Sequence, residues 1–388
     1  MPDRSYFDWN ATTPLRPAAR EAMAEALAVA GNPSSVHAEG RAARRVVEQA
    51  REQVAALVGA KPPDVFFTSS GTEANMLALT PAIETQNEKQ PRDKLLISAI
   101  EHSSVRAGGR FPHQAIADLP VDGEGLIDLA ALKPALSGSS RALVSIMLAN
   151  NETGVIQPVA EAASIVHASG GLLHVDAIQA VGRIPVDIGT LDADFLTLSA
   201  HKIGGPKGVG ALVRRDDALH VAEPLIRGGG QERGMRAGTE NVPGIVAFGA
   251  AAAAVHDGFA SEAGRMRVLR DKLEAGLKAI SPRAVIFGSG ADRLPNTTLF
   301  AVEGLRAETA VIAFDLEGIA VSSGAACSSG KVQPSHVLAA MGVSPALTRG
   351  AVRLSLGWTT TETDIERFLG AWRKLATALS KGHAGMAA

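Results

Sequence analysis

The sequence has 388 residues, of which 46% are hydrophobic and 20% charged, and this composition excludes a disordered or low-complexity chain. The 38 basic and 40 acidic residues give a formal net charge of −2, so no overall field would recruit nucleic acid or an anionic membrane. A single cysteine, Cys327, excludes an internal disulfide, a CxxC redox pair and a multi-cysteine metal site. This thiol therefore either has no specific function or takes part in a reaction.

The sequence contains no uninterrupted apolar run of the roughly 18 residues that a membrane span needs, and the best run, residues 245–255, stops at His256. The N-terminus lacks the basic and apolar regions of a secretory signal. We therefore expect a cytoplasmic protein without a membrane or nucleic-acid partner.

In chain order, apolar side chains at helical spacing first predict helices over residues 17–30 and 42–58. Short apolar runs then alternate with helical stretches and predict buried strands at 65–68, 95–98, 143–147, 172–175, 195–199 and 210–213. This alternation is typical of a parallel α/β sheet. After an apolar stretch at 245–255 and a charged helix over 261–280, strands are predicted at 297–302 and 351–356, and helices at 307–316 and from about 361. We predict a large α/β domain over residues 16–257 and a small α+β domain made of 1–15 and 258–388.

The strand predicted at 65–68 leads into Thr68-Ser-Ser-Gly-Thr-Glu-Ala-Asn75, where a helical pattern begins. Small residues such as Gly71 let an anion approach the N–H groups of a helix N-terminus, and Thr72 adds a hydroxyl donor for a phosphate. A simple helix N-cap explains the same pattern equally well. Neither a complete GxGxxG nor a Walker A motif follows any predicted strand, which weakens the case for a dinucleotide or a nucleoside triphosphate.

Two further predicted strands end in polar residues. Asp176 follows residues 172–175, at the end of a strand where ligands of α/β sheets bind, and its carboxylate could pair with a protonated ring nitrogen or simply cap a helix. Lys202 follows the strand at 195–199, and a lysine in such a place can form a Schiff base. Most lysines are merely solvated, but a phosphate anchor, a carboxylate and a lysine at three strand ends are what pyridoxal 5'-phosphate requires.

A series of motifs resembles those of cysteine desulfurases of the NifS/IscS type, which are class V aminotransferases. In order they are Asp8-Trp-Asn-Ala-Thr-Thr-Pro14, Gly31-Asn-Pro-Ser-Ser35, Thr68-Ser-Ser-Gly-Thr-Glu73, Glu101-His102-Ser, Asn150-Asn-Glu-Thr-Gly154, His174-Val-Asp-Ala177, Ser199-Ala-His-Lys202, Arg236-Ala-Gly-Thr-Glu-Asn241 and Ser322-Ser-Gly-Ala-Ala-Cys-Ser328. The resemblance implies the fold of pyridoxal-phosphate-dependent transferases of fold type I, like aspartate aminotransferase, with a large mostly parallel sheet domain and a smaller α+β domain.

The resemblance also implies an activity: conversion of L-cysteine to L-alanine, with the sulfur passed as a Cys327 persulfide to an acceptor or scaffold protein, for iron–sulfur cluster assembly or other sulfur trafficking. Lys202 would bond to the cofactor and then move the substrate Cα proton, and His102 would stack on the cofactor ring. Arg353, together with Asn151, would bind the substrate carboxylate. The other implied cofactor contacts are Gly71, Thr72, Asn151, Asp176, Gln179, Ser199, His201 and, from the second subunit of a homodimer, Thr239.

Cys327 lies in Ser322-Ser-Gly-Ala-Ala-Cys-Ser-Ser-Gly330, a run of small residues that predicts an exposed and mobile loop. An inert buried thiol would more often sit in an apolar periodic segment. We therefore expect the Cys327 thiolate to attack the substrate sulfur. No intrinsic metal site is predicted, although Cys327 could ligate a transferred iron–sulfur cluster.

Two alternatives stay open at this point. The first is another class V enzyme, a selenocysteine lyase or an aminotransferase, which uses the same lysine without an obligatory persulfide. The second is a binding protein that kept the fold without catalysis. The long cysteine loop resembles that of desulfurases which deliver sulfur directly to scaffolds, whereas the chain lacks the longer C-terminal extension of housekeeping members, so a housekeeping and a specialised NifS-like role both fit.

Overall fold

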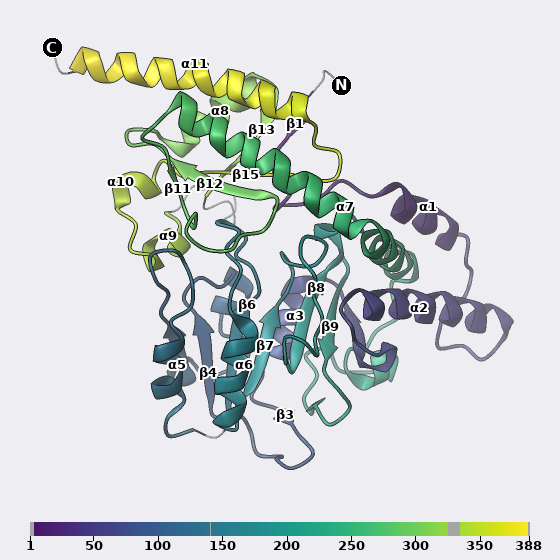
Figure 1. Cartoon of the computed structure of the whole chain (residues 1–388). Helices are drawn as coiled ribbons and strands as arrows, with labels where there is room; N and C mark the ends of the chain where they lie inside the picture. The colour runs from purple at the N-terminus through teal and green to yellow at the C-terminus, as the bar shows by residue number, and fades with distance from the viewer. Residues whose placement is uncertain (1–3, 140, 325–333, 387–388) are drawn as a thin grey trace.

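The computed structural model of the chain describes residues 4–139, 141–324 and 334–386, with the backbone alone for 380–386. Its largest sheet has the strand order β2-β9-β8-β7-β6-β4-β5 (Figure 1). The strands are Val65–Thr68 (β2), Lys94–Ser98 (β4), Ile116–Leu119 (β5), Ala142–Met147 (β6), Leu172–Asp176 (β7), Phe195–Ser199 (β8) and Gly210–Arg214 (β9). Strand β9 is antiparallel to both of its neighbours, and the strands from β8 to β5 are parallel to one another. The predicted fold class, with a large and mostly parallel sheet, is confirmed.

Both faces of this sheet are buried, as the apolar runs predict. Successive residues of a strand point to opposite faces, so Leu96 and Val144 belong to one core cluster and Leu95 and Leu143 to another. The first face packs against α1 (Pro17–Ala26), α2 (Ala38–Leu57), α5 (Leu129–Leu136), α6 (Val159–Ala168) and the first half of α7 (Val242–Ile280). The second face is covered by α3 (Gly71–Ala78), α4 (Ser103–Arg106) and the short pair β3 (Ile83–Glu84) and β10 (His220–Val221).

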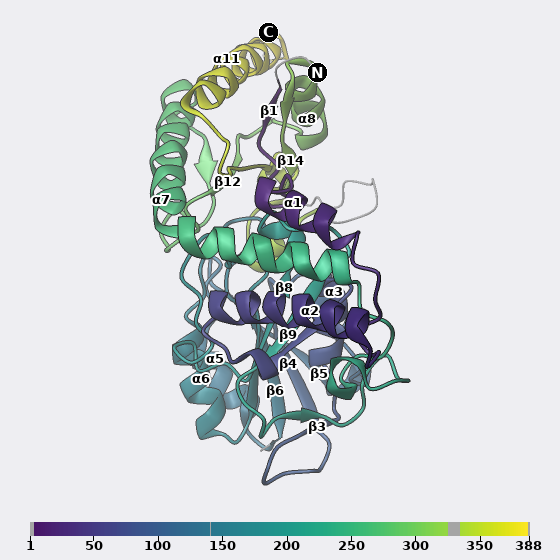
Figure 2. The same ribbon diagram turned by 90° about the vertical axis from the view of Figure 1, so that its right-hand side faces the viewer.

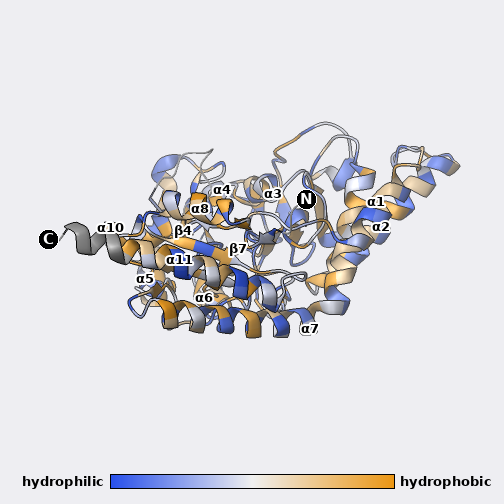
Figure 3. Ribbon diagram, turned by 90° about the horizontal axis from the view of Figure 1, so that it is seen from above, coloured by the Kyte–Doolittle hydropathy of each residue, from blue (hydrophilic) through white to orange (hydrophobic). Residues whose placement is uncertain are grey.

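Helix α7 connects the two main cores of the molecule. It lies against α1 and α2 with its first half and reaches the second core with its last half, where Leu273 and Leu277 are buried (Figure 2). The sequence predicts two separate stretches here, but the exposed His256 and Asp257 continue the helix on its solvent side. Figure 3 shows hydrophilic and hydrophobic residues alternating along α7, as expected of a helix with one buried side. The predicted domain boundary near residue 257 falls inside α7, and the division into two domains stays a prediction.

By length and composition alone, α7 is long and apolar enough to cross a membrane. Half of its most apolar window is buried inside the protein, however, and the buried core helix of a soluble protein passes the same test.

The second core is built around a four-stranded antiparallel sheet with the order β11-β12-β15-β14. Phe300, Phe314, Phe368 and Trp372 fill it from the sheet and from the helices above it. This part of the chain contains Val285–Ile286 (β11), Thr297–Ala301 (β12), Ala307–Leu316 (α8), Ser322–Ser323 (β14), His336–Ala340 (α9), Pro345–Thr348 (α10), Val352–Ser355 (β15) and Glu362–Met386 (α11), of which α9 and α10 pack in a separate small cluster with Phe287 and Leu299. The N-terminal strand Ser5–Tyr6 (β1) pairs in parallel with Ile319–Ala320 (β13) at the side of this core.

The segment that follows β1, residues 8–13, runs between the two sheets. Asp8 forms a parallel bridge with Ser355 of β15, and the Asn10 N–H donates to the Ser355 hydroxyl. At its other end, the Thr13 N–H donates to the His201 carbonyl beyond β8. This short segment, residues 8–13, is called the N-terminal strap below. It contacts β15 of the second sheet and the turn that follows β8 of the first sheet.

Candidate active site

The carboxyl ends of β7 and β8 carry the polar residues that the sequence selects. Asp176 is the last residue of β7, Ser199 is the last residue of β8, and these strands are neighbours in the sheet. Strand β9 begins at the same edge, where Gly210 is paired with both Ser199 and Thr68. The antiparallel insertion of β9 thus brings the end of β2, and with it the start of α3, to the edge where Asp176 lies.

The N-terminus of α3 approaches this edge closely because Gly71 has no side chain. A Cβ atom at Gly71 would lie 2.4 Å from Ile178 Cδ1 and 3.2 Å from Ser199 Cβ. Thr72 is exposed one residue further along the helix. Ser70 caps α3 by accepting from the Glu73 N–H at 3.1 Å, so capping explains part of the motif. The remaining Gly71 and Thr72 lie where helix N–H groups can meet an anion beside Ser199.

Asp176 is buried and held in place by two donors. The Asn75 amide donates to its Oδ2 at 2.9 Å, and the Ile178 N–H donates to its Oδ1 at 3.0 Å. Burial raises the pKa of Asp176, while the two hydrogen bonds and the nearby His102 and Lys202 lower it. His102, which is predicted to stack on the cofactor ring, caps α4, where its ring nitrogen Nδ1 accepts from the Ser104 N–H. Burial lowers the pKa of His102 and the charge of Asp176 raises it, so the two side chains influence each other's protonation.

Lys202 lies in the 3-10 turn Ala200–Lys202 that follows β8, and its amine is bound to the N-terminal strap. It donates to the Ala11 carbonyl at 2.8 Å and also to the carbonyl of Asn10. The Gln179 amide donates to the same Asn10 carbonyl at 2.9 Å, while Gln179 Oε1 is buried without a partner. The carbonyls of the strap therefore gather Lys202 and Gln179 at one place.

His201 faces the strap as well, with its Nδ1 3.2 Å from the Thr12 hydroxyl. Burial lowers the pKa of His201 to about 4, and neighbouring Lys202 adds to that shift. The imidazole is therefore neutral near pH 7, which makes it a hydrogen-bonding group rather than a second cation beside Lys202.

Arg353 enters the same region from the second sheet, in the middle of β15. Its side chain is only 3% exposed; Nη1 donates to the Asn151 carbonyl at 3.0 Å and Nη2 to Asp8 Oδ1 at 2.7 Å. The remaining Nε is buried without a partner. A planar guanidinium with an unused donor suits a carboxylate ligand.

Two predicted site residues are not joined to the others. Thr239 lies exposed between the turn Gln231–Gly234 and α7, and none of the hydrogen bonds between described residues links it to the rest of the site. Cys327 lies outside the described residues. The chain leading toward it begins at the site, because Ser322 of β14 is paired with Arg353.

The residues present fit the cofactor that the sequence predicts. The edge offers helix N–H groups beside a glycine, a buried carboxylate, a lysine amine and the unpartnered Gln179 Oε1. Buried polar atoms in proteins nearly always have a partner, so Gln179 Oε1 is an acceptor that a ligand at this edge can use. A phosphate, a ring nitrogen and a carbonyl carbon are the groups that this set of side chains can receive.

Sequence reasoning assigned no role to several residues that hold the site together. They are Asp8 and Asn10 in the strap, Asn75 and Thr197 beneath Asp176, and the buried carboxyls Glu101 and Glu152. All of them except Thr197 stand within or directly beside the quoted motifs, which was the available signal. Burial raises the pKa of Glu152 to about 7, and the Ser335 hydroxyl, just before α9, is bonded to its carboxyl.

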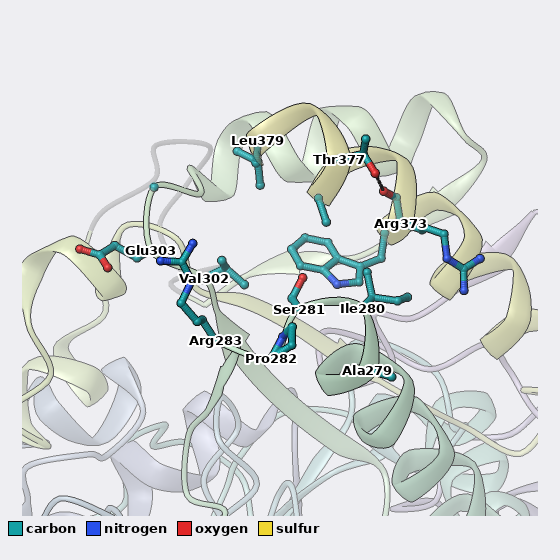
Figure 4. Close-up of a pocket in the computed structure, with 13 residues that line it drawn as sticks. Ala279, Ile280, Ser281, Pro282, Arg283, Val302, Glu303, Arg373, Thr377 and Leu379 are labelled. Atoms are coloured by element: carbon teal, nitrogen blue, oxygen red, sulfur yellow. Dashed lines mark hydrogen bonds between the residues drawn. The ribbon is translucent and has the colours of Figure 1, made fainter. Parts of the chain in front are cut away.

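A spacious cavity of the described residues lies elsewhere. It encloses about 970 Å³ between the end of α7, the Val302–Gly304 turn and α11 (Figure 4). A much smaller cavity of about 20 Å³ adjoins Lys202 under Trp9 and Trp358. The chemistry of the residues, rather than the size of a cavity, identifies the candidate site.

Comparisons with known proteins place the whole chain in one family. The aminotransferase class-V family model matches residues 5–368. A cysteine desulfurase of Cereibacter sphaeroides is 45% identical, covering 95% of this chain and 94% of that protein. An IscS-like cysteine desulfurase of Mycobacterium tuberculosis is 41% identical with 94% of both chains covered. Among solved structures, a NifS-like protein from Rickettsia africae matches with a TM-score of 0.85 at 37% identity, covering 96% of this chain and 99% of that one.

Proposed function

The chain belongs to the class V aminotransferase family and is a cysteine desulfurase, and from that premise we propose that it works with pyridoxal 5'-phosphate at the carboxyl edge of the seven-stranded sheet. The observation that carries the proposal is the convergence of Lys202, Asp176 and the start of α3 at one edge. When bound, the cofactor supplies an electron sink for negative charge at the substrate Cα. Everything else is the work of the protein's own side chains.

In this proposal Gly71, Thr72, Ser199 and His201 hold the phosphate, with neutral His201 as a hydrogen-bonding partner. Asp176, oriented by Asn75 and the Ile178 N–H, holds the proton of the ring nitrogen by its negative charge. His102 contacts the ring, and Gln179 and Asn151 lie beside its polar substituents.

Lys202 carries the proton away from the substrate Cα and returns one later. The carbonyls of Asn10 and Ala11 give its amine a fixed place next to the site whenever it is not bonded elsewhere. Arg353 binds the substrate carboxylate, with its unpartnered Nε as the available donor.

The proposed sulfur transfer uses Cys327. The thiolate forms an S–S bond to the substrate sulfur while the substrate Cβ–S bond breaks, and the electron pair of that bond leaves with the carbon. Protonation of that carbon gives alanine, and the sulfur remains on Cys327 as a persulfide. A low-pKa or exposed thiol carries out such exchange readily, and a lone cysteine has no neighbouring thiol to resolve the persulfide.

We further propose that the protein is a cytoplasmic sulfurtransferase that passes this sulfur to an acceptor protein, for iron–sulfur cluster assembly or other sulfur trafficking. A homodimer is part of the proposal, because the exposed Thr239 would then complete the phosphate site of the second subunit.

The experiment that tests the proposal is incubation of the purified protein with L-cysteine, followed by mass analysis of the peptide that contains Cys327. We expect a mass increase of one sulfur atom and formation of alanine. The variant Cys327→Ser should keep the visible absorbance of the bound cofactor and lose the persulfide. Normal sulfur transfer by this variant, or amino transfer that depends on a keto acid, would contradict the proposed reaction.

A further inference from the structure

We propose that Asp8 is a positioning residue that orients the Arg353 guanidinium for the substrate carboxylate and thereby lowers the KM for L-cysteine. The inference rests on the proposed function in one respect, namely that Arg353 binds this carboxylate. Asp8 and Arg353 are 345 residues apart in the sequence and meet only in the folded chain.

The contacts of Arg353 define which part of the guanidinium is fixed and which part is available. Asp8 Oδ1 holds Nη2 at 2.7 Å, and the Asn151 carbonyl holds Nη1 at 3.0 Å. These two acceptors belong to different parts of the chain, so together they set the plane of the guanidinium. The buried Nε has no hydrogen-bond partner among the described residues, and each Nη atom carries a second N–H, so these are the donors left for a ligand.

Asp8 is held by its backbone rather than by its ion pair. Its neighbours Phe7 and Trp9 are buried, and the Phe7 carbonyl accepts from the Ser355 N–H at 2.8 Å. The Tyr6 hydroxyl donates to the Asp8 carbonyl at 3.1 Å. Since these contacts fix the strap independently of Arg353, the carboxylate can act as a preorganised acceptor for the guanidinium.

Arg353 is more deeply buried than Asp8, as expected if Asp8 supplies the counter-charge for a buried guanidinium. The side chain of Arg353 is 3% exposed, whereas that of Asp8 is 23% exposed. A buried guanidinium without a counter-charge would be costly, and a partly solvated carboxylate supplies that charge at a smaller desolvation cost. A ligand carboxylate at Nε can then bind beside an arginine whose orientation is already set.

Other charges near Arg353 cannot replace Asp8. Burial and the charge of Arg353 lower the pKa of Arg183 to about 10, so Arg183 adds a like charge. Glu152 is bonded to the Ser335 hydroxyl, and burial raises its pKa to about 7. Among the described residues, Asp8 is the carboxylate that forms an ion pair with Arg353.

The test compares Asp8→Ala and Asp8→Asn with the unchanged enzyme, using L-cysteine and L-cysteine methyl ester, which lacks the carboxylate charge. We expect Asp8→Ala to raise the KM for L-cysteine about tenfold with kcat changed less than about twofold, the loss of one charge-assisted hydrogen bond. Asp8→Asn keeps an acceptor oxygen and should raise KM about threefold. The KM for the methyl ester should stay unchanged in both variants.

Glu274→Gln is the matched control, because Glu274 of α7 forms a similarly buried pair with Arg293, which lies between β11 and β12. It should lower the melting temperature and leave the KM for L-cysteine unchanged. If Asp8→Ala fails to fold, Asp8→Asn decides the question by the same criterion.

Three outcomes overturn the inference. A lower KM in the Asp8 variants would mean that Asp8 competes with the substrate carboxylate, and an equal rise for both substrates would mean a general structural defect. An unchanged KM in the Asp8 variants, while Arg353→Ala raises KM, would refute the role of Asp8 alone. If Arg353→Ala itself leaves the KM for L-cysteine unchanged, the proposed role of Arg353 fails first.

Discussion

Two buried polar regions meet at the candidate site, and they differ in how completely their atoms are paired. In the N-terminal strap, Asn10 donates from its amide to the Thr297 hydroxyl and the Asn151 carbonyl, and its Oδ1 accepts from Asn296. At the sheet edge, Gln179 Oε1 has no partner. Since an unpaired buried group costs free energy, the paired atoms of the strap contribute to stability, whereas Gln179 Oε1 can still accept a hydrogen bond from a ligand.

Arg353 belongs to both regions at once. Its two Nη atoms are paired with the strap and with Asn151, whereas its Nε is unpaired. The comparison therefore predicts that changes at the sheet edge lower the rate or the affinity, and that changes in the strap lower the stability as well.

The largest effect is expected at the sheet edge, from Lys202→Ala. Loss of the amine should lower kcat by at least about a thousandfold, because the proton at the substrate Cα then has no carrier. The two hydrogen bonds to the strap carbonyls contribute about 2 kcal/mol of the free energy of unfolding that the variant would lose. Alanine formation and urea denaturation measure the two quantities. Substantial turnover in this variant would contradict the catalytic role of Lys202 at the sheet edge.

Asn10→Ala tests the strap. The substitution leaves the buried Asn296 amide and Thr297 hydroxyl with fewer partners and should destabilise the protein by about 3 kcal/mol. The matched control is Asn32→Ala on the surface, where one exposed turn bond is lost and the cost should stay below about 1 kcal/mol. Equal midpoints of denaturation for the two variants would show that the side-chain hydrogen bonds of Asn10 do not contribute to the stability of the protein.

The carboxyl of Glu152 gives a pH test of the buried network. Its folded pKa is about 7 against an ordinary 4.5, so its contribution is fully present below pH 4.5 and is lost as pH rises toward 7. The unfolding free energy should decline over this window by on the order of 3 kcal/mol from this group. Glu152→Gln should remove that decline in pH-dependent denaturation, and an unaltered pH profile would exclude the buried carboxyl as its source.

The smallest effect is expected at Glu73, a paired residue at the sheet edge. It accepts from Arg236 Nε and the Ser69 N–H, both at 2.9 Å, and although burial opposes the shift, these bonds lower its pKa. Its contribution is present above pH 4.5 and is lost as pH falls through the folded pKa, the opposite of Glu152. Glu73→Gln should cost about 1 kcal/mol at pH 7 and leave kcat unchanged. A large loss of kcat would show that pairing does not separate structural from functional residues here.

Most elements could be predicted because their signals are local. The strands β2, β4, β6, β7, β8 and β9 follow from short apolar runs, and they lie within a residue of the predicted bounds. Strand β5 was missed because Ala117 and Asp118 are exposed and break its apolar run. The apolar stretch at 245–255 and the helix predicted over 261–280 are parts of one helix, α7, because exposed polar residues between them are compatible with the solvent side of a long helix.

The sequence by itself determined the chemical groups of this protein: a lone Cys327, a lysine and an aspartate at strand ends, and a glycine at the start of a helix. Parallel strands that end in polar residues bring those residues to a common edge of the sheet. The local pattern was therefore sufficient to predict that Asp176 and Lys202 lie at this edge. Only the tertiary structure decided that the strap holds the lysine amine and that Asp8 pairs with Arg353. Such partners are separated by hundreds of residues. The periodicity of the sequence does not predict which distant acceptor will form a hydrogen bond with a buried donor.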